Sequence, residues 1–324
     1  MGASPGFTRV SKTTLPRIPV LREMNGSEMT TTRRTANWTL LTVIGLLCAI
    51  AAPVQAYDRD AGFVEHDVQS AFSHIRIRRN GYVRTMIFVR DNGEEAWESQ
   101  MNLKSPHVLK FTYLQHMFAN YLLQPKQSKV LIVGLGGGSM VHFLQKHDPT
   151  VAVDAVEIDP VVVQLAERFF NLKPQKNVKL IVADGFEYFK KTQTKYDTIY
   201  MDAFLKPSAE TDETGVPLQL RTIQFYQQLQ SRLTEGGCVV FNINPHAGLD
   251  EDLKTITKAF PQTYVFSLPN SEGVVAVGSM LPERRELDAL REAGAAMDKR
   301  FKASFSFEAV ASRLRKPIVI KDGE

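Results

Sequence analysis

From residue 129 onward, short apolar runs alternate with segments in which apolar residues recur every three or four positions. The runs are typical of buried strands in a parallel sheet, and the second pattern is typical of amphipathic helices. The predicted strands are residues 130–133, 151–158, 178–182, 197–201 and 238–242; the predicted helices begin near 139 and span 161–170, 186–191, 222–233 and 250–260. Strands that alternate with helices predict an α/β fold with a doubly wound, Rossmann-like sheet.

Two further predicted strands, residues 263–268 and 273–278, follow one another without a helix between them. Since a parallel pair needs a long crossover, they predict an antiparallel hairpin at one edge of the sheet. The Rossmann-like domain is therefore expected to span residues 125–281. Residues 282–324 are predicted to form a charged helix and a tail.

The pattern is different ahead of this domain. Residues 73–78 and part of residues 82–89 alternate polar and apolar positions, and the turn signals Asn80-Gly81 and Asp91-Asn92-Gly93 separate them. Such alternation predicts a small antiparallel sheet before the main domain. The arginines at alternate positions are interpreted as a solvated strand face rather than a binding patch: Arg76, Arg78 and Arg84.

Residues 1–56 are predicted to be a leader. Arg33 and Arg34 precede an apolar run at residues 40–52, and the small residues at 54 and 56 fit the exit of a secretory signal. About 13 apolar residues are few for a membrane span, although an uncleaved anchor stays open. Both interpretations predict a periplasmic, secreted or membrane-anchored protein. A cytoplasmic protein is the alternative if the start of the chain is misassigned.

The formal charge of +4 comes from this leader, because residues 1–56 hold six of the 39 basic residues and only two of the 35 acidic ones. The neutral remainder contains no dense basic tract, which argues against a nucleic-acid binder. The two cysteines are Cys48, in the leader, and Cys238. A processed chain would therefore form neither an internal disulfide nor a cysteine metal site, and no metal is expected.

A glycine-rich turn follows the strand at 130–133, with Gly134, Gly136 and Gly138 ahead of the helix that begins near Ser139. The next strand ends on Glu157, whose carboxylate can accept hydrogen bonds from both hydroxyls of a ribose. A dinucleotide fingerprint would need glycine at position 139, so Ser139 favours an S-adenosylmethionine-type ligand. A tight structural turn without a ligand is the alternative.

Four acids end predicted strands or begin the turns after them: Glu157, Asp159, Asp184 and Asp202. Ligands of open α/β sheets bind at the carboxyl ends of the strands, and four acids there suit a cationic nucleoside. Asp184 could accept from the adenine amino group, with the backbone of Gly185 against the ring. Asp202 would lie where the sulfur meets the acceptor. The alternative for Asp184 and Asp202 is a helix cap, which is also the preferred interpretation of Asp159.

Pro106 opens a predicted helix at residues 107–123, so residues 57–124 are expected to combine the small β-unit with this leading helix. The helix carries two candidates to assist Asp202, the single candidate for a base or amine anchor. These are Tyr113 and His116, although a packed histidine is favoured over a catalytic one at position 116.

From Lys129 to about Gly278 the chain resembles the spermidine/spermine synthase (polyamine aminopropyltransferase) family. The segments VLIVGLGGG, VEIDPVVVQLAERFF and VADGFEYFKK...YDTIYMD carry the resemblance. The β-unit and leading helix occupy the place of that family's small N-terminal β-domain. The resemblance implies that Glu157 holds the ribose, Asp184 and Gly185 the adenine, and the glycine turn the methionine-derived part.

Three positions depart from the family. Ser139 stands where an aspartate usually grips the amine of the transferred group, and Leu205 stands where an aspartate takes a proton from the acceptor amine. Phe111-Thr112-Tyr113 replaces the usual tyrosine-histidine/glutamine-glutamate run. The segment Asp202-Ala203-Phe204, with residues 216–222 and Phe225, resembles the divergent spermidine-synthase-like branch.

The chain is therefore predicted to be a spermidine-synthase-like transferase. It would bind S-adenosylmethionine or its decarboxylated form and transfer an aminopropyl group to an amine or polyamine, mainly by positioning the two reactants in line. An S-adenosylmethionine-dependent methyltransferase and a non-catalytic nucleoside- or polyamine-binding protein are the alternatives. A nicotinamide dehydrogenase is disfavoured by Ser139. Membrane anchoring through the leader and a homodimer stay open.

Overall fold

The computed structural model describes residues 62–204 and 208–318, all within one compact unit, Val54–Glu324. The predicted signal and anchor at residues 1–56 lie outside the described residues, as does Leu205, so the location of the protein stays a prediction. Within 62–204 and 208–318, no helix is long and apolar enough to cross a membrane.

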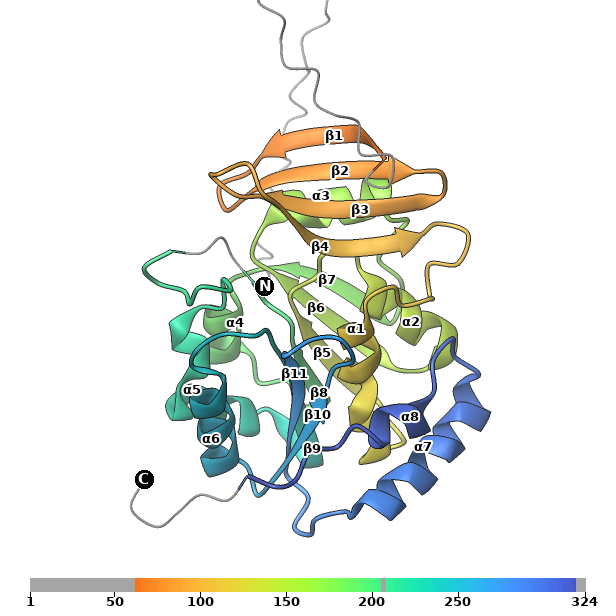
Figure 1. Cartoon of the computed structure of the whole chain (residues 1–324), viewed down its shortest axis with the longest axis vertical. Coiled ribbons are helices and arrows are strands. Elements are labelled where there is room, and N and C mark those ends of the chain that lie inside the picture. The colour runs from red at the N-terminus through yellow and green to blue at the C-terminus, as the bar shows by residue number, and fades with distance from the viewer. Residues whose placement is uncertain (1–61, 205–207, 319–324) are drawn as a thin grey trace, which may run out of the picture. The chain divides into compact units, whose positions relative to one another are not determined.

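The main domain is built on a seven-stranded sheet (Figure 1). Its strands, in spatial order, are β10 (Gln262–Ser267), β11 (Val274–Ser279), β9 (Leu233–Ile243), β8 (Tyr196–Met201), β5 (Lys129–Val133), β6 (Ala152–Glu157) and β7 (Val178–Val182). The five strands from β9 to β7 are parallel, whereas β11 pairs antiparallel with both β9 and β10. The doubly wound, Rossmann-like fold and its antiparallel edge hairpin are confirmed.

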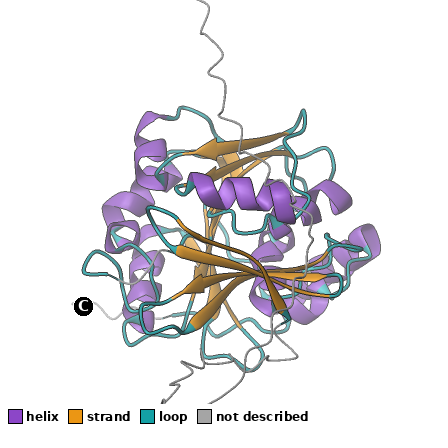
Figure 2. Cartoon of the chain, turned by 90° about the horizontal axis from the view of Figure 1, so that it is seen from above, coloured by secondary structure: helices purple, strands orange, loops and turns teal. Residues whose placement is uncertain are grey.

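Helices cover both faces of this sheet (Figure 2), because its central strands bury mostly apolar residues on both sides. Along β5, Val130 and Ile132 face one core cluster and Leu131 and Val133 face the other. The helices that follow the strands are α2 (Ser139–His147), α3 (Pro160–Phe169), α4 (Gly185–Lys191), α5 (Ile223–Gln230) and α6 (Leu249–Ala259).

A four-stranded antiparallel sheet precedes this domain, as predicted. It consists of β1 (Phe63–Gln69), β2 (His74–Asn80), β3 (Val83–Val89) and β4 (Glu95–Asn102). The buried side chains of Ile75 and Ile77 pack against Leu165 and Phe169 of α3, which ties the sheet to the main domain. The arginines are less solvated than the sequence predicts, because they are paired with acids: Arg76 with Asp67 and Glu95, Arg78 with Glu95, and Arg84 with Glu65.

The leading helix is shorter than predicted. Residues 103–111 form turns, and the side chain of Asn102 accepts a hydrogen bond from the Lys104 amide at their start. The α-helix α1 therefore covers only Thr112–Met117. It continues as a 3₁₀ helix, η1 (Phe118–Leu122), and α1 packs against β9 and β11.

The C-terminal segment is also more ordered than a helix and a tail. It contains α7 (Leu287–Phe301) and α8 (Phe307–Ala311), and Phe301 and Phe307 join the main core. Arg315 then donates its backbone N–H to Val265 O of β10, at 2.7 Å.

Candidate active site

A pocket of about 1020 Å³, its open mouth included, lies at the carboxyl ends of β5, β6, β7 and β8, below β4 of the small sheet. This volume suits a nucleoside that carries a methionine-like tail. The acids and the tyrosine that line it are Glu98, Tyr113, Glu157, Asp184 and Asp202. No lysine or arginine is among the described residues that line it. The pocket is therefore suited to a cationic ligand.

The glycine turn forms the floor of this pocket. Gly134 has a φ of 94°, and a Cβ there would lie 2.0 Å from the carbonyl oxygen of Asp202, because β5 and β8 are adjacent. Glycine at 134 is therefore required by packing. Gly138 caps α2 in the left-handed region, with a φ of 76°, and Gly136 and Gly138 line the pocket. The turn thus has a structural role and also faces the ligand space.

Glu157 is held in place by the turn. Its Oε2 accepts the backbone N–H of Leu135 at 2.9 Å, and its Oε1 accepts that of Asp159 at 3.0 Å. Burial raises the pKa of Glu157, while these backbone donors oppose the rise. Both oxygens keep lone pairs for further donors, as the predicted ribose contact requires.

Asp184 and Asp159 both cap helices. Asp184 Oδ1 accepts from the Glu187 amide at 2.8 Å and Asp159 Oδ1 accepts from the Val161 amide at 2.8 Å, so each starts its helix. Asp159 Oδ2 also accepts from the hydroxyl of Ser70, in the turn between β1 and β2, at 2.5 Å. Asp184 and Gly185 nevertheless line the pocket, so for Asp184 the cap and the predicted ligand contact are compatible.

Asp202 accepts side-chain hydrogen bonds instead of capping a helix. Asn242 Nδ2 donates to its Oδ1 at 2.9 Å, and the Tyr113 hydroxyl approaches its Oδ2 at 3.4 Å. Burial raises the pKa of Asp202 to about 6, against the lowering effect of these two donors. The structure therefore brings Tyr113 and Asp202 together, as predicted.

His116 is not brought to the pocket. Its ring is buried, its Nδ1 lies 2.9 Å from Thr112 O of the preceding turn, and the pocket-lining residues do not include it. Burial, opposed by the Thr112 contact, lowers the pKa of His116, and the charge of Arg313 after α8 adds to the lowering. The helix turns His116 toward the core while Tyr113 faces Asp202, so the packed interpretation holds.

Ser139 lines the pocket at the start of α2, where its Oγ is buried and has no hydrogen-bond partner among the described residues. Glu98 of β4 also lines the pocket, and the sequence did not predict it. Burial, together with the negative charges of Asp202 and Glu157, raises the pKa of Glu98 to about 7, although Arg90 opposes the rise. In the sequence, Glu98 is one of several glutamates in a strand that was not predicted. No local pattern marks it as a site residue.

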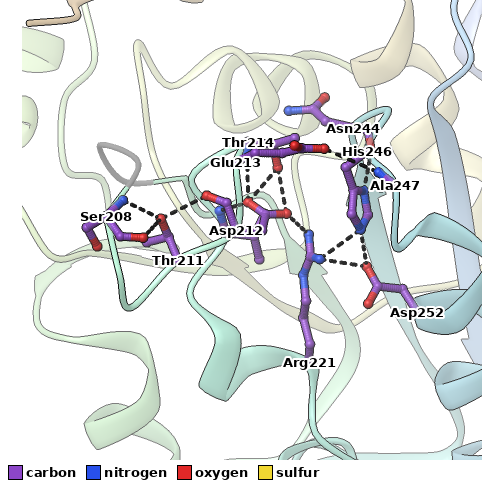
Figure 3. Close-up of polar contacts among 11 residues, drawn as sticks. Ser208, Thr211, Asp212, Glu213, Thr214, Arg221, Asn244, His246, Ala247 and Asp252 are labelled. Atoms are coloured by element: carbon purple, nitrogen blue, oxygen red, sulfur yellow. Dashed lines mark hydrogen bonds and ion pairs between the residues drawn. The ribbon is translucent and has the colours of Figure 1, made fainter.

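The segment between β8 and α5 closes one side of the pocket through Pro217, Gln219 and Leu220. Asp212 organises this segment, because its Oδ1 accepts the backbone N–H groups of Thr214 and Val216, each at 2.8 Å (Figure 3). The remaining carboxylate oxygen of Asp212 accepts from a guanidinium.

That guanidinium belongs to Arg221, at the end of the 3₁₀ helix η2 (Leu218–Arg221). Its Nη1 donates to Asp252 Oδ2 of α6 at 2.9 Å and to His246 Nε2 at 2.8 Å (Figure 3). Asp212 lies in the loop and Asp252 lies in α6, and both acids are largely buried. Arg221 therefore links the loop to the main domain.

Arg221→Met should lower the free energy of unfolding by about 2 kcal/mol, because two shielded carboxylates lose their shared cation. It should also raise KM for the nucleoside more than it lowers kcat, since the loop shapes the pocket wall. Denaturant unfolding and steady-state kinetics measure both. Arg291→Met, which breaks an exposed pair with Glu308, is the control and should cost at most about 0.5 kcal/mol. Equal losses in the two variants would contradict this role.

The spermine/spermidine synthase domain matches residues 112–269. This segment is similar to the spermine/spermidine synthase family. The chain is also 28% identical to the polyamine aminopropyltransferase of Vibrio vulnificus over 262 residues, which cover 80% of this chain and 84% of that protein. The resemblance to a divergent spermidine-synthase-like protein is confirmed.

Solved structures agree with the fold. Human methyltransferase-like protein 13 in complex with SAH matches with a TM-score of 0.55 and 25% identity, covering 66% of this chain and 96% of that one. A spermidine synthase in complex with the transition-state analogue AdoDATO matches with a TM-score of 0.59 and 22% identity, covering 78% and 85%. One of these two solved proteins is a methyltransferase-like protein that holds SAH, and the other is a spermidine synthase that holds AdoDATO.

Proposed function

We propose that this protein transfers an aminopropyl group from decarboxylated S-adenosylmethionine to a small amine or polyamine. The observation that carries the proposal is Asp202, whose carboxylate lies at the acid-lined pocket with Tyr113 and Asn242 as its partners. An anion there stabilises the positive charge of the acceptor amine, and Glu157, Asp184 and Gly185 are assigned to the nucleoside.

The reaction is a nucleophilic displacement. The lone pair of a neutral acceptor amine forms a bond to the carbon next to sulfur, and the carbon–sulfur electrons return to sulfur, which leaves as a neutral thioether. Positive charge therefore moves from sulfur to the amine nitrogen. Carboxylates fixed around that nitrogen favour the transition state, and the pocket holds the two reactants in line.

Methyl transfer from S-adenosylmethionine is the second candidate, and Ser139 favours it. The buried Ser139 hydroxyl replaces an acid, so it does not repel the carboxylate that S-adenosylmethionine retains. Ser139→Asp should shift the ratio of affinities toward the decarboxylated nucleoside by about 10- to 100-fold, because a carboxylate attracts the ammonium and repels the carboxylate of the tail. Calorimetry with the two nucleosides measures the ratio, with Ser312→Asp as the control. An unchanged ratio would remove Ser139 from the tail site.

The test of the function is a transfer assay on the full-length protein. The protein is incubated with putrescine or spermidine and with each nucleoside in turn, and mass spectrometry identifies the product. Aminopropylated amine supports the proposal, and methylated amine supports the second candidate. Nucleoside binding without either product would refute both and leave a non-catalytic binding protein.

A further inference from the structure

Glu98 occupies a β-bulge. Met86 of β3 pairs with Ser99 and its neighbour Ile87 pairs with Trp97, so Glu98 is an extra residue on β4 without a partner on β3. A bulge re-aims the side chain of its extra residue and is common beside active sites. The two flanking side chains fit this geometry, because Ser99 is buried against Gly137 while Trp97 is 48% exposed. The bulge therefore turns the carboxyl of Glu98 out of the sheet alternation and into the pocket.

Glu98 also stands where the nucleoside pocket meets a second one. The second pocket shares Phe88, Glu98, Tyr113 and Phe204 with the first and extends away from the glycine turn. Its other walls include the polar residues His74, Arg90, Thr214, Asn242 and Asn244. A molecule in the second pocket would thus reach the nucleoside by passing Glu98 and Tyr113.

The other acids near Glu98 on the small sheet have structural partners. Glu65 and Glu95 pair with arginines, Asp67 pairs with His74 and Arg76, and Glu94 pairs with Arg90. The side chain of Glu98 has no ion pair or hydrogen bond with residues 62–204 and 208–318. A shielded carboxyl without a cation is costly as an anion, and a bound ammonium would remove that cost.

We propose that Glu98 binds the ammonium group of the acceptor opposite Asp202 and takes its proton, so that a primary amine held in the second pocket becomes the nucleophile. This inference rests on the proposed function and names the proton acceptor for it. The acceptor nitrogen loses one proton to the Glu98 carboxylate, giving a neutral amine and a carboxylic acid. The amine then attacks the carbon next to sulfur as described above, and Glu98 returns the proton to solvent.

The pH dependence of the reaction follows from the charges around Glu98. Burial, Asp202 and Glu157 raise the pKa of Glu98, and Arg90 lowers it. The Tyr113 hydroxyl stays neutral because burial and the charges of Asp202 and Glu98 raise its own pKa. The base is competent only as a carboxylate, so kcat/KM, which reports the ligand-free protein, should rise as the pH passes about 7, the pKa of Glu98. Glu98→Gln should remove this limb and lower kcat about 100-fold at pH 8.

Amine binding gives a test that does not need turnover. The full-length wild type, Glu98→Gln and the control Glu251→Gln are titrated with putrescine in the presence of saturating methylthioadenosine. Glu251 is a suitable control because its side chain is 73% exposed on α6. Glu98→Gln should bind putrescine at least tenfold more weakly and methylthioadenosine as the wild type does. In the wild type at pH 7, putrescine binding should release about half a proton from Glu98, measured in buffers of different ionisation enthalpy.

The possible outcomes separate the role of Glu98 from the proposed reaction. Unchanged putrescine affinity in Glu98→Gln, no proton release by the wild type, or no putrescine binding by the wild type would overturn the assignment. If Glu98→Gln fails to fold, proton release by the wild type still decides it. Transfer that proceeds equally in Glu98→Gln would refute the base and leave the proposed function standing. No transfer by the wild type, with putrescine binding that depends on Glu98, would refute the proposed reaction and leave the amine site standing.

Discussion

Asp202→Asn should lower kcat/KM for group transfer about 100- to 1000-fold, the loss typical of removing one preorganised electrostatic contact to the reacting atoms. In the proposed reaction the carboxylate lies next to the nitrogen that becomes positive, and asparagine keeps the size of the side chain but not its charge. Asn242 and Tyr113 both donate to Asp202, so an amide in its place would also lose one of these two contacts. Steady-state kinetics at pH 8, where the wild-type carboxyl is ionised, measures the effect.

The control for Asp202→Asn is Asp250→Asn, at an exposed position in the first turn of α6, which should retain wild-type kinetics. Methylthioadenosine affinity should stay within about threefold in both variants, because Asp202 is assigned to the acceptor side. A loss of transfer below fivefold in Asp202→Asn would refute an amine-binding role. A parallel loss of nucleoside affinity would move Asp202 to the nucleoside site.

Glu157→Ala should weaken methylthioadenosine binding about 100-fold, which corresponds to ~2.7 kcal/mol. A carboxylate that accepts from ribose hydroxyls contributes about 1.5–3 kcal/mol for each such bond. The substitution also leaves the Leu135 and Asp159 amides without their acceptor, which loosens the glycine turn. Calorimetric titration of the full-length protein gives the affinity.

Glu157→Gln separates the two causes, because it keeps the shape of the side chain and one oxygen for the backbone donors. It should retain the thermal stability of the wild type more closely than Glu157→Ala while still losing at least tenfold in affinity. The exposed Glu251→Ala serves as the control. Wild-type affinity in Glu157→Gln would show that the acid supports the turn and does not bind the ribose.

The sequence was sufficient for those parts of the site that are local in the chain. The glycine turn, Glu157 and Asp184 lie within one strand–turn–helix unit each, so strand ends predicted from apolar runs already place them at one edge of the sheet. The same local pattern identified Asp159 as a cap, because an aspartate before a proline at a helix start is a local signal.

Contacts between segments that are distant in the chain do not follow from local sequence patterns. Tyr113 and Asp202 are 89 residues apart, and their 3.4 Å approach depends on how α1 packs against the sheet. His116 lies three residues further along the same helix, yet packing turns it into the core. Helical spacing alone places both residues near one face and does not say which of them reaches the pocket.

The alternation of apolar runs and helical periods by itself determined the succession of strands and helices along the chain, the class of fold and the edge of the sheet at which the pocket lies, because these follow from local burial. Only the tertiary structure decided that Glu98 belongs to the site. Its position depends on the register between β3 and β4 and on the bulge that turns it toward Asp202. Register is fixed by the packing of the whole sheet against α3, and a shift of one residue would point a different side chain into the pocket.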